Sequence, residues 1–186
     1  MRKSLLSTLL LLPRGFAGSS PRARDTKNDV TYEGLVRNDI ELFLNIPYGQ
    51  DTSGEHRFKP PRLHVPEAGS VVKAQSYGPA CPQPLGNSSP LVLGNITEVS
   101  EDCLNLVVAR PRGVGAKDRL PVMVWIHGGG FWSGSNNEPS TAPDGLIQES
   151  VKNGLPVLYV AINYRLGCKN LVEQFSLLCF LGFHKF

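Results

Sequence analysis

The feature that most constrains the fold is a pair of short apolar runs in the second half of the chain. Val122–Ile126 and Leu158–Ile162 are rich in β-branched residues and carry no charge, which is typical of strands covered on both faces. Between them, Gly145–Asn153 favours a helix with Leu146, Ile147 and Val151 on one side, and Gly154 would stop it. A strand, a helix and a strand in this order predict a right-handed crossover and a parallel pair in an α/β fold.

The first half of the chain predicts shorter strands. Val30–Tyr32 and Leu35–Val36 lie on either side of a Glu-Gly pair, and Ile40–Leu44 alternates imperfectly, so we expect strands around a turn there. Residues 46–62 are too rich in Pro and Gly for a helix or a central strand and are interpreted as an ordered surface loop. A further strand is predicted over Leu104–Ala109.

A run of glycines follows the first apolar strand directly, in the octapeptide His127–Gly134 (HGGGFWSG). Consecutive glycines let backbone N–H groups turn toward a common point, which suits an oxyanion that develops during acyl transfer. Phosphate loops are excluded, because no Gly-Lys-Ser/Thr follows and the dinucleotide pattern would need glycine at Ser133. A flexible turn is the alternative, but the position after a strand favours a functional loop.

The N-terminus has the layout of an export signal. Arg2 and Lys3 precede the apolar run Leu5–Leu12 and a small-x-small site at Gly15–Ala17, which predicts a signal peptide over residues 1–17. The run is shorter than the roughly 20 residues that span a bilayer, so no membrane span is expected. The alternative is an ordinary buried or disordered N-terminal stretch.

Other features agree with a secreted protein. Asn87 and Asn95 begin N-glycosylation sequons. Four cysteines permit two disulfides in an oxidising compartment; they are Cys81, Cys103, Cys168 and Cys179. The net charge of +3 is small and dispersed, which excludes an obvious nucleic-acid surface.

Four strings in order now resemble one family. Tyr77–Cys81, Ser100–Asn105, His127–Gly134 and Asn163–Gly167 are similar to segments of the type-B carboxylesterase and cholinesterase branch of the α/β-hydrolase fold. The resemblance covers about residues 28–167. It implies the N-terminal portion of that fold, a mixed and mostly parallel sheet with antiparallel N-terminal strands in the order 1-2-4-3-5. It also implies hydrolysis of a small-molecule or lipid ester through a serine acyl-enzyme, without metal or cofactor.

The resemblance assigns roles to residues of the glycine loop. Gly129 and Gly130 would donate backbone N–H groups to the oxyanion. Phe131 and Trp132 would lie near an apolar pocket, although core packing is an equal alternative for Trp132. Trp125 is expected in the core.

The same resemblance implies two structural pairs. Cys81 and Cys103 would form a disulfide, and Glu101 and Arg165 an ion pair, the alternative being two solvated charges. His127 is expected to be structural, and none of the other histidines is assigned as a catalytic base; they are His56, His64 and His184.

The nucleophile expected of this family is missing from the sequence. It stands in G-x-S-x-G, and neither Ser133 nor Ser135 lies in that pattern. No Ser/His/Asp set can be assigned, so we expect the chain alone to be inactive. Two alternatives to an enzyme remain, a non-catalytic adhesion module and an inactive product of a truncated gene model.

The C-terminal segment 168–186 departs from the family pattern, since residues 168–179 interrupt a motif that returns briefly before the end. A retained intron or faulty gene model, or a genuine short isoform, would explain this. On the family's strand order, Val122–Ile126 pairs with Leu158–Ile162 and its other edge stays open. An apolar open edge predicts aggregation.

Overall fold

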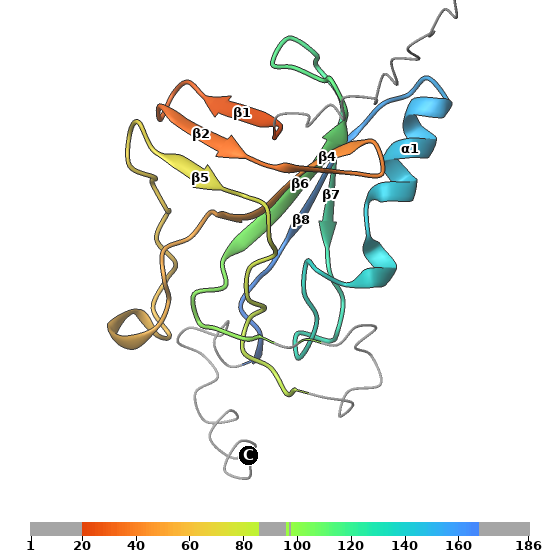
Figure 1. Ribbon diagram of the computed structural model, residues 1–186. Helices are drawn as coiled ribbons and strands as arrows, with labels where there is room; N and C mark the ends of the chain where they lie inside the picture. Colours follow the sequence, from red (N-terminus) through yellow and green to blue (C-terminus); the bar gives the residue numbers. More distant parts are fainter. Residues whose placement is uncertain (1–19, 86–95, 97, 168–186) are drawn as a thin grey trace, which may run out of the picture.

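The computed structural model describes residues 20–85, 96 and 98–167 of the 186. The predicted signal peptide, the sequon residues Asn87 and Asn95, and the tail 168–186 with its two cysteines lie outside the described residues. Two sheets and one α-helix form the described part (Figure 1). The three-stranded sheet has the order β1-β2-β5, with β1 Arg22–Asp25, β2 Val30–Glu33 and β5 Val71–Lys73.

The larger sheet has five strands in the order β3-β4-β6-β8-β7. Its strands are β3 Leu35–Arg37, β4 Ile40–Pro47, β6 Asn105–Pro111, β7 Val122–Ile126 and β8 Leu158–Ile162. The predicted pairing of β7 with β8 is confirmed, in parallel register from Val122 opposite Leu158 to Ile126 opposite Ile162. The other pairs are antiparallel. The sheet is therefore mixed as expected, but in the described residues its parallel part is limited to β7 and β8.

The prediction of a turn between the strands at Val30–Tyr32 and Leu35–Val36 is wrong. β2 and β3 belong to different sheets, and the chain crosses between them at Gly34. A Cβ there would lie 2.3 Å from the carbonyl oxygen of Leu42, so the crossing is too close for a side chain. The tight turn instead joins β3 to β4 at Asn38 and Asp39, with φ of 49° and 61°, because both central residues of such a hairpin turn need positive φ.

The loop predicted over residues 46–62 is present from residue 48 on, with a 3-10 turn at Gly54–His56, whereas Ile46 and Pro47 form the end of β4. The short strands β1 and β5 were not anticipated from the sequence. Their burial is shallow, and β1 (Arg-Ala-Arg-Asp) contains three charged residues and one alanine, whereas β5 has only three residues, so hydrophobic periodicity gives no signal for them.

The core lies between the larger sheet and α1 (Asp144–Lys152), which packs on β4 and β6. Ile147 is fully buried, whereas Leu146 and Val151 are exposed, so only one of the three residues expected on the buried side is buried. Gly154 follows the helix with φ +72°, in agreement with the predicted stop. The buried residues of this core are Ile40, Leu42, Leu44, Val107, Ala109, Ile147, Tyr159 and Ala161.

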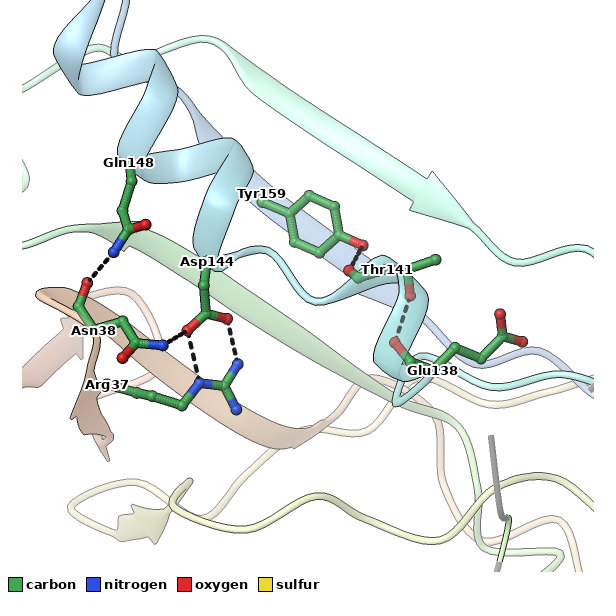
Figure 2. A network of polar contacts seen from close by, with 7 residues as sticks. All are labelled: Arg37, Asn38, Glu138, Thr141, Asp144, Gln148 and Tyr159. Carbon is green, nitrogen blue, oxygen red and sulfur yellow. Dashed lines mark hydrogen bonds and ion pairs between the residues drawn. The ribbon is translucent and has the colours of Figure 1, made fainter. Parts of the chain in front are cut away.

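Polar contacts fix α1 to the β3–β4 turn, as Figure 2 shows. The carboxylate of Asp144, in the first helical turn, accepts two hydrogen bonds from Arg37 at 2.9 and 2.6 Å and one from Asn38 at 2.8 Å. Burial opposes ionisation of Asp144, but these bonds outweigh it and lower the pKa. Further bonds join Gln148 to the Asn38 carbonyl and Tyr159 to the Thr141 carbonyl.

β7 differs from what its composition predicts. All five of its residues are exposed, from 39% for Trp125 to 61% for Ile126. The expectation of a strand covered on both faces, with Trp125 in the core, is therefore wrong for the part of the chain that is described. The expected open edge is confirmed for the described residues. There β7 is the last strand of the sheet, with β8 on one side and no described strand on the other. No helix among the described residues is long and apolar enough to span a membrane.

Candidate oxyanion site

The loop that follows β7 has a backbone that only glycine can adopt at two positions. Gly129 and Gly134 have φ of +105° and +119°. A Cβ on Gly129 would lie 1.9 Å from the carbonyl oxygen of Ser133, and one on Gly134 would lie 2.3 Å from Nδ1 of His127. The loop thus folds back on itself so tightly that side chains are excluded there.

Several carbonyl groups of the loop accept hydrogen bonds that hold the loop in place. The Tyr164 hydroxyl donates to the His127 carbonyl at 2.7 Å, and the Gly167 N–H donates to the Phe131 carbonyl at 2.7 Å. The Gly129 carbonyl accepts from the N–H of Trp132 at 3.0 Å. Among the described residues, the N–H groups of Gly129 and Gly130 meet no hydrogen-bond acceptor. Free donors in a rigid loop are the groups that an anion can use.

His127 supports the loop from inside. Its ring stacks on Tyr164 with 4.2 Å between the ring centres, and its Nδ1 lies 2.9 Å from the Gly128 carbonyl oxygen. The residue is buried, and this burial lowers the pKa of the imidazole. Packing of this kind fits the structural role that was expected of His127.

An apolar hollow of about 440 Å³ adjoins the loop. It is lined by Ile126, His127, Gly128, Gly130, Phe131, Ile162 and Tyr164. Phe131 lines this hollow, whereas Trp132 is outside the lining and about two-fifths exposed; a role of either residue in binding substrate stays a prediction. Because Gly130 belongs to the lining, an apolar group in the hollow would lie beside Gly130.

The disulfide implied by the family resemblance is present. Cys81 and Cys103 are bonded with their Cα atoms 5.0 Å apart, and both are buried against Leu104 and Leu166. The bond closes a loop with a sequence separation of 22 residues. It holds the segment around Cys81 against the residues that lead into β6.

The two charged residues expected to pair each have a described contact with another residue. Glu101 accepts from Arg57 at 2.8 and 2.6 Å, and the hydrogen bond to Glu101 raises the pKa of Arg57. The buried guanidinium of Arg165 donates to the Lys59 carbonyl at 2.9 Å. An ion pair between Glu101 and Arg165 stays a prediction, and Arg57 is a partner that the sequence did not indicate.

Buried amide side chains form a second support that the sequence analysis missed. Asn163 Oδ1 accepts from the backbone N–H of Asn136 at 2.7 Å, and Asn136 Nδ2 donates to Asn105 Oδ1 at 3.0 Å. These bonds tie the end of the glycine loop to the beginning of β6 and the end of β8. Asn105 and Asn163 each lie in one of the four strings that resemble the family, and this position was the feature of the sequence that could have pointed to them. No group of three metal-ligating side chains occurs in the described ranges.

Comparison with known proteins agrees with this architecture. The model of the carboxylesterase family matches residues 27–169. A secreted lipase of Arthroderma benhamiae is 47% identical over 171 residues, which cover 91% of this chain and 29% of the lipase. The inactive carboxylesterase-like protein VdtD of Byssochlamys spectabilis is 47% identical over 149 residues, 80% of this chain and 26% of VdtD.

Solved structures give the same picture. A thermophilic PNB esterase superposes with a TM-score of 0.63 at 36% identity, covering 75% of this chain and 27% of the esterase. Aspergillus niger EstA superposes with a TM-score of 0.67 at 27% identity, covering 84% of this chain and 28% of EstA.

The fold and the loop thus place the chain among the α/β-hydrolase esterases. More particularly, the chain belongs to the carboxylesterase family. It spans less than a third of the length of these relatives.

Proposed function

We propose that this chain supplies the oxyanion-binding part of a secreted carboxylic ester hydrolase and hydrolyses no ester by itself. The observation that carries the proposal concerns the N–H groups of Gly129 and Gly130, which meet no acceptor among the described residues, in a loop whose carbonyl groups at His127, Gly129 and Phe131 are hydrogen-bonded. In a complete enzyme of this type, a serine activated by histidine attacks the ester carbonyl. The two N–H groups would then stabilise the negative oxygen of the tetrahedral intermediate.

The apolar hollow supports an ester with an apolar acyl or alkyl group. Its lining places Phe131 and Ile126 next to Gly130, so an apolar chain could be buried while the carbonyl oxygen meets the donors. Secretion is supported by the export-like N-terminus and by the secreted lipase among the relatives. N-glycosylation at Asn87 and Asn95 belongs to the same proposal.

A second candidate is a binding module without catalysis. It is favoured by one observation, the 47% identity with a relative that is named as inactive. The two candidate functions differ in one testable property. Only in the enzyme should the loop support ester hydrolysis once a catalytic serine is supplied.

A chimera tests the difference. Residues 27–167 of this chain would replace the matching segment of the Arthroderma lipase, which supplies the remainder of the fold. We expect p-nitrophenyl ester hydrolysis by the chimera and none above background by residues 18–186 alone. In the chimera, Gly129→Ala should lower kcat by about 100-fold or more, because the Cβ would collide with Ser133 and displace an oxyanion donor.

Gly128→Ala is the matched control, since a Cβ there meets no atom within 4 Å. A folded chimera without activity would favour the binding module. Serine-reagent-sensitive turnover by residues 18–186 alone would contradict the proposal that the nucleophile is not in this chain.

A further inference from the structure

One side chain joins the disulfide segment to the glycine loop. The carboxamide of Gln83 hydrogen-bonds to both backbone polar groups of Gly134. Gln83 Nε2 donates to the Gly134 carbonyl at 2.9 Å, and Gln83 Oε1 accepts from the Gly134 N–H at 2.8 Å. The same Nε2 donates to the Cys81 carbonyl at 3.0 Å, so one amide links both segments.

Gly134 is a sensitive position for such a link. Its φ of +119° holds the chain directly against the ring of His127 and the Gly128 carbonyl. A shift of Gly134 would therefore displace His127 or Gly128, which immediately precede the proposed donors. The two bonds from Gln83 hold both peptide groups that flank Gly134, one through its N–H and the other through its carbonyl.

We propose that Gln83 is a positioning residue for the oxyanion loop and couples its geometry to the Cys81–Cys103 disulfide. The positioning role in catalysis rests on the function proposed above, but the coupling of the loop to Gln83 does not. Gln83 follows Cys81 by two residues, and Cys81 is buried and covalently fixed to Cys103. The disulfide thus holds the segment from which the side chain reaches Gly134.

Amide hydrogen exchange of the full chain, folded under oxidising conditions, tests the coupling. In Gln83→Met the side chain keeps about the same length and loses all three hydrogen bonds, two to Gly134 and one to Cys81. We expect the Gly134 amide to exchange about 5- to 10-fold faster, corresponding to the loss of a hydrogen bond worth about 1 kcal/mol. The amides of Ala80 and Asn163, which donate to backbone carbonyls nearby, should keep their rates, whereas general unfolding would accelerate them all.

Gln75→Met is the matched control, because Gln75 Nε2 also donates to a backbone carbonyl, that of Gly34, far from the loop. It should leave the Gly134 amide unchanged. An unchanged Gly134 rate in Gln83→Met, or equal acceleration of all three amides, would overturn the coupling.

The catalytic consequence is measured in the lipase chimera. A positioning role predicts that Gln83→Met lowers kcat at least 10-fold with little change in KM, because donor alignment matters most in the transition state. An unchanged kcat would overturn the positioning role even if exchange at Gly134 rises. A chimera that is inactive with Gln83 in place would count against the proposed function, while the exchange experiment would still decide the coupling.

Discussion

β7 and the loop His127–Gly134 are neighbours in the sequence but opposite in their surroundings. The strand has the composition of a core element, yet all five residues are exposed and one edge is open among the described residues. The loop has the composition of a flexible turn, yet it is bonded to Tyr164, Gly167 and Gln83. The amino-acid composition of a segment limits the structures it can form. Its burial and order depend on which other residues contact it in the folded protein.

The largest expected effect concerns the exposed strand. Residues 18–186 should self-associate and be poorly soluble, because an uncharged apolar edge strand is a template for pairing. Val124→Lys should raise the soluble monomeric fraction severalfold, measured by size exclusion with light scattering. Val36→Lys, on the opposite edge strand β3, is the control and should change little, because Val36 is the only apolar side chain of that short edge that is well exposed. A parent chain that stays monomeric at all concentrations would contradict this view of β7.

The next effect concerns the covalent support of the loop. Replacing Cys81 and Cys103 together by Ala should lower the free energy of unfolding by about 3 kcal/mol on the chain-entropy model for a loop of this length. Chemical denaturation in the soluble Val124→Lys background measures it. Amide exchange at Gly134 should also rise, and if it did not, the loop would be held independently of the disulfide.

A smaller effect is expected from backbone strain in the loop. Gly134→Ala should destabilise the fold by about 2 kcal/mol, because the residue has positive φ and its Cβ would meet His127. Gly128→Ala should cost little, because a Cβ there has open space. Thermal unfolding of the two variants compares them directly, and equal midpoints would show that the loop is as adaptable as its composition suggests.

The smallest effect is a pH dependence from His127. Burial lowers its pKa in the folded state, so the unfolded state binds the proton more readily and stability is full above the unfolded pKa. We expect the unfolding free energy to decline as the pH falls below about 6.5. His127→Gln should flatten this decline, measured by denaturation between about pH 7.5 and pH 5.5.

Much of the framework could be predicted from local patterns. The runs at Val122–Ile126 and Leu158–Ile162 and the helix stop at Gly154 gave strands and a helix within one or two residues of those observed. The prediction of strands and turns failed where a segment is stabilised by residues far away in the sequence. β1 and β5 have too few apolar residues to be recognised, and the separation of β2 from β3 depends on a close approach of Gly34 to Leu42.

The sequence by itself determined which backbone conformation the loop can adopt, because φ values of +105° and +119° at Gly129 and Gly134 are open to glycine and rarely to other residues. The tertiary structure alone decided which groups hold that loop and which of its N–H groups meet an acceptor among the described residues. Gln83 lies 51 residues from Gly134, and Arg57 lies 44 residues from Glu101. Hydrogen bonds over such separations leave no local periodicity in the sequence, since they depend on where folding brings the side chains rather than on the residues beside them.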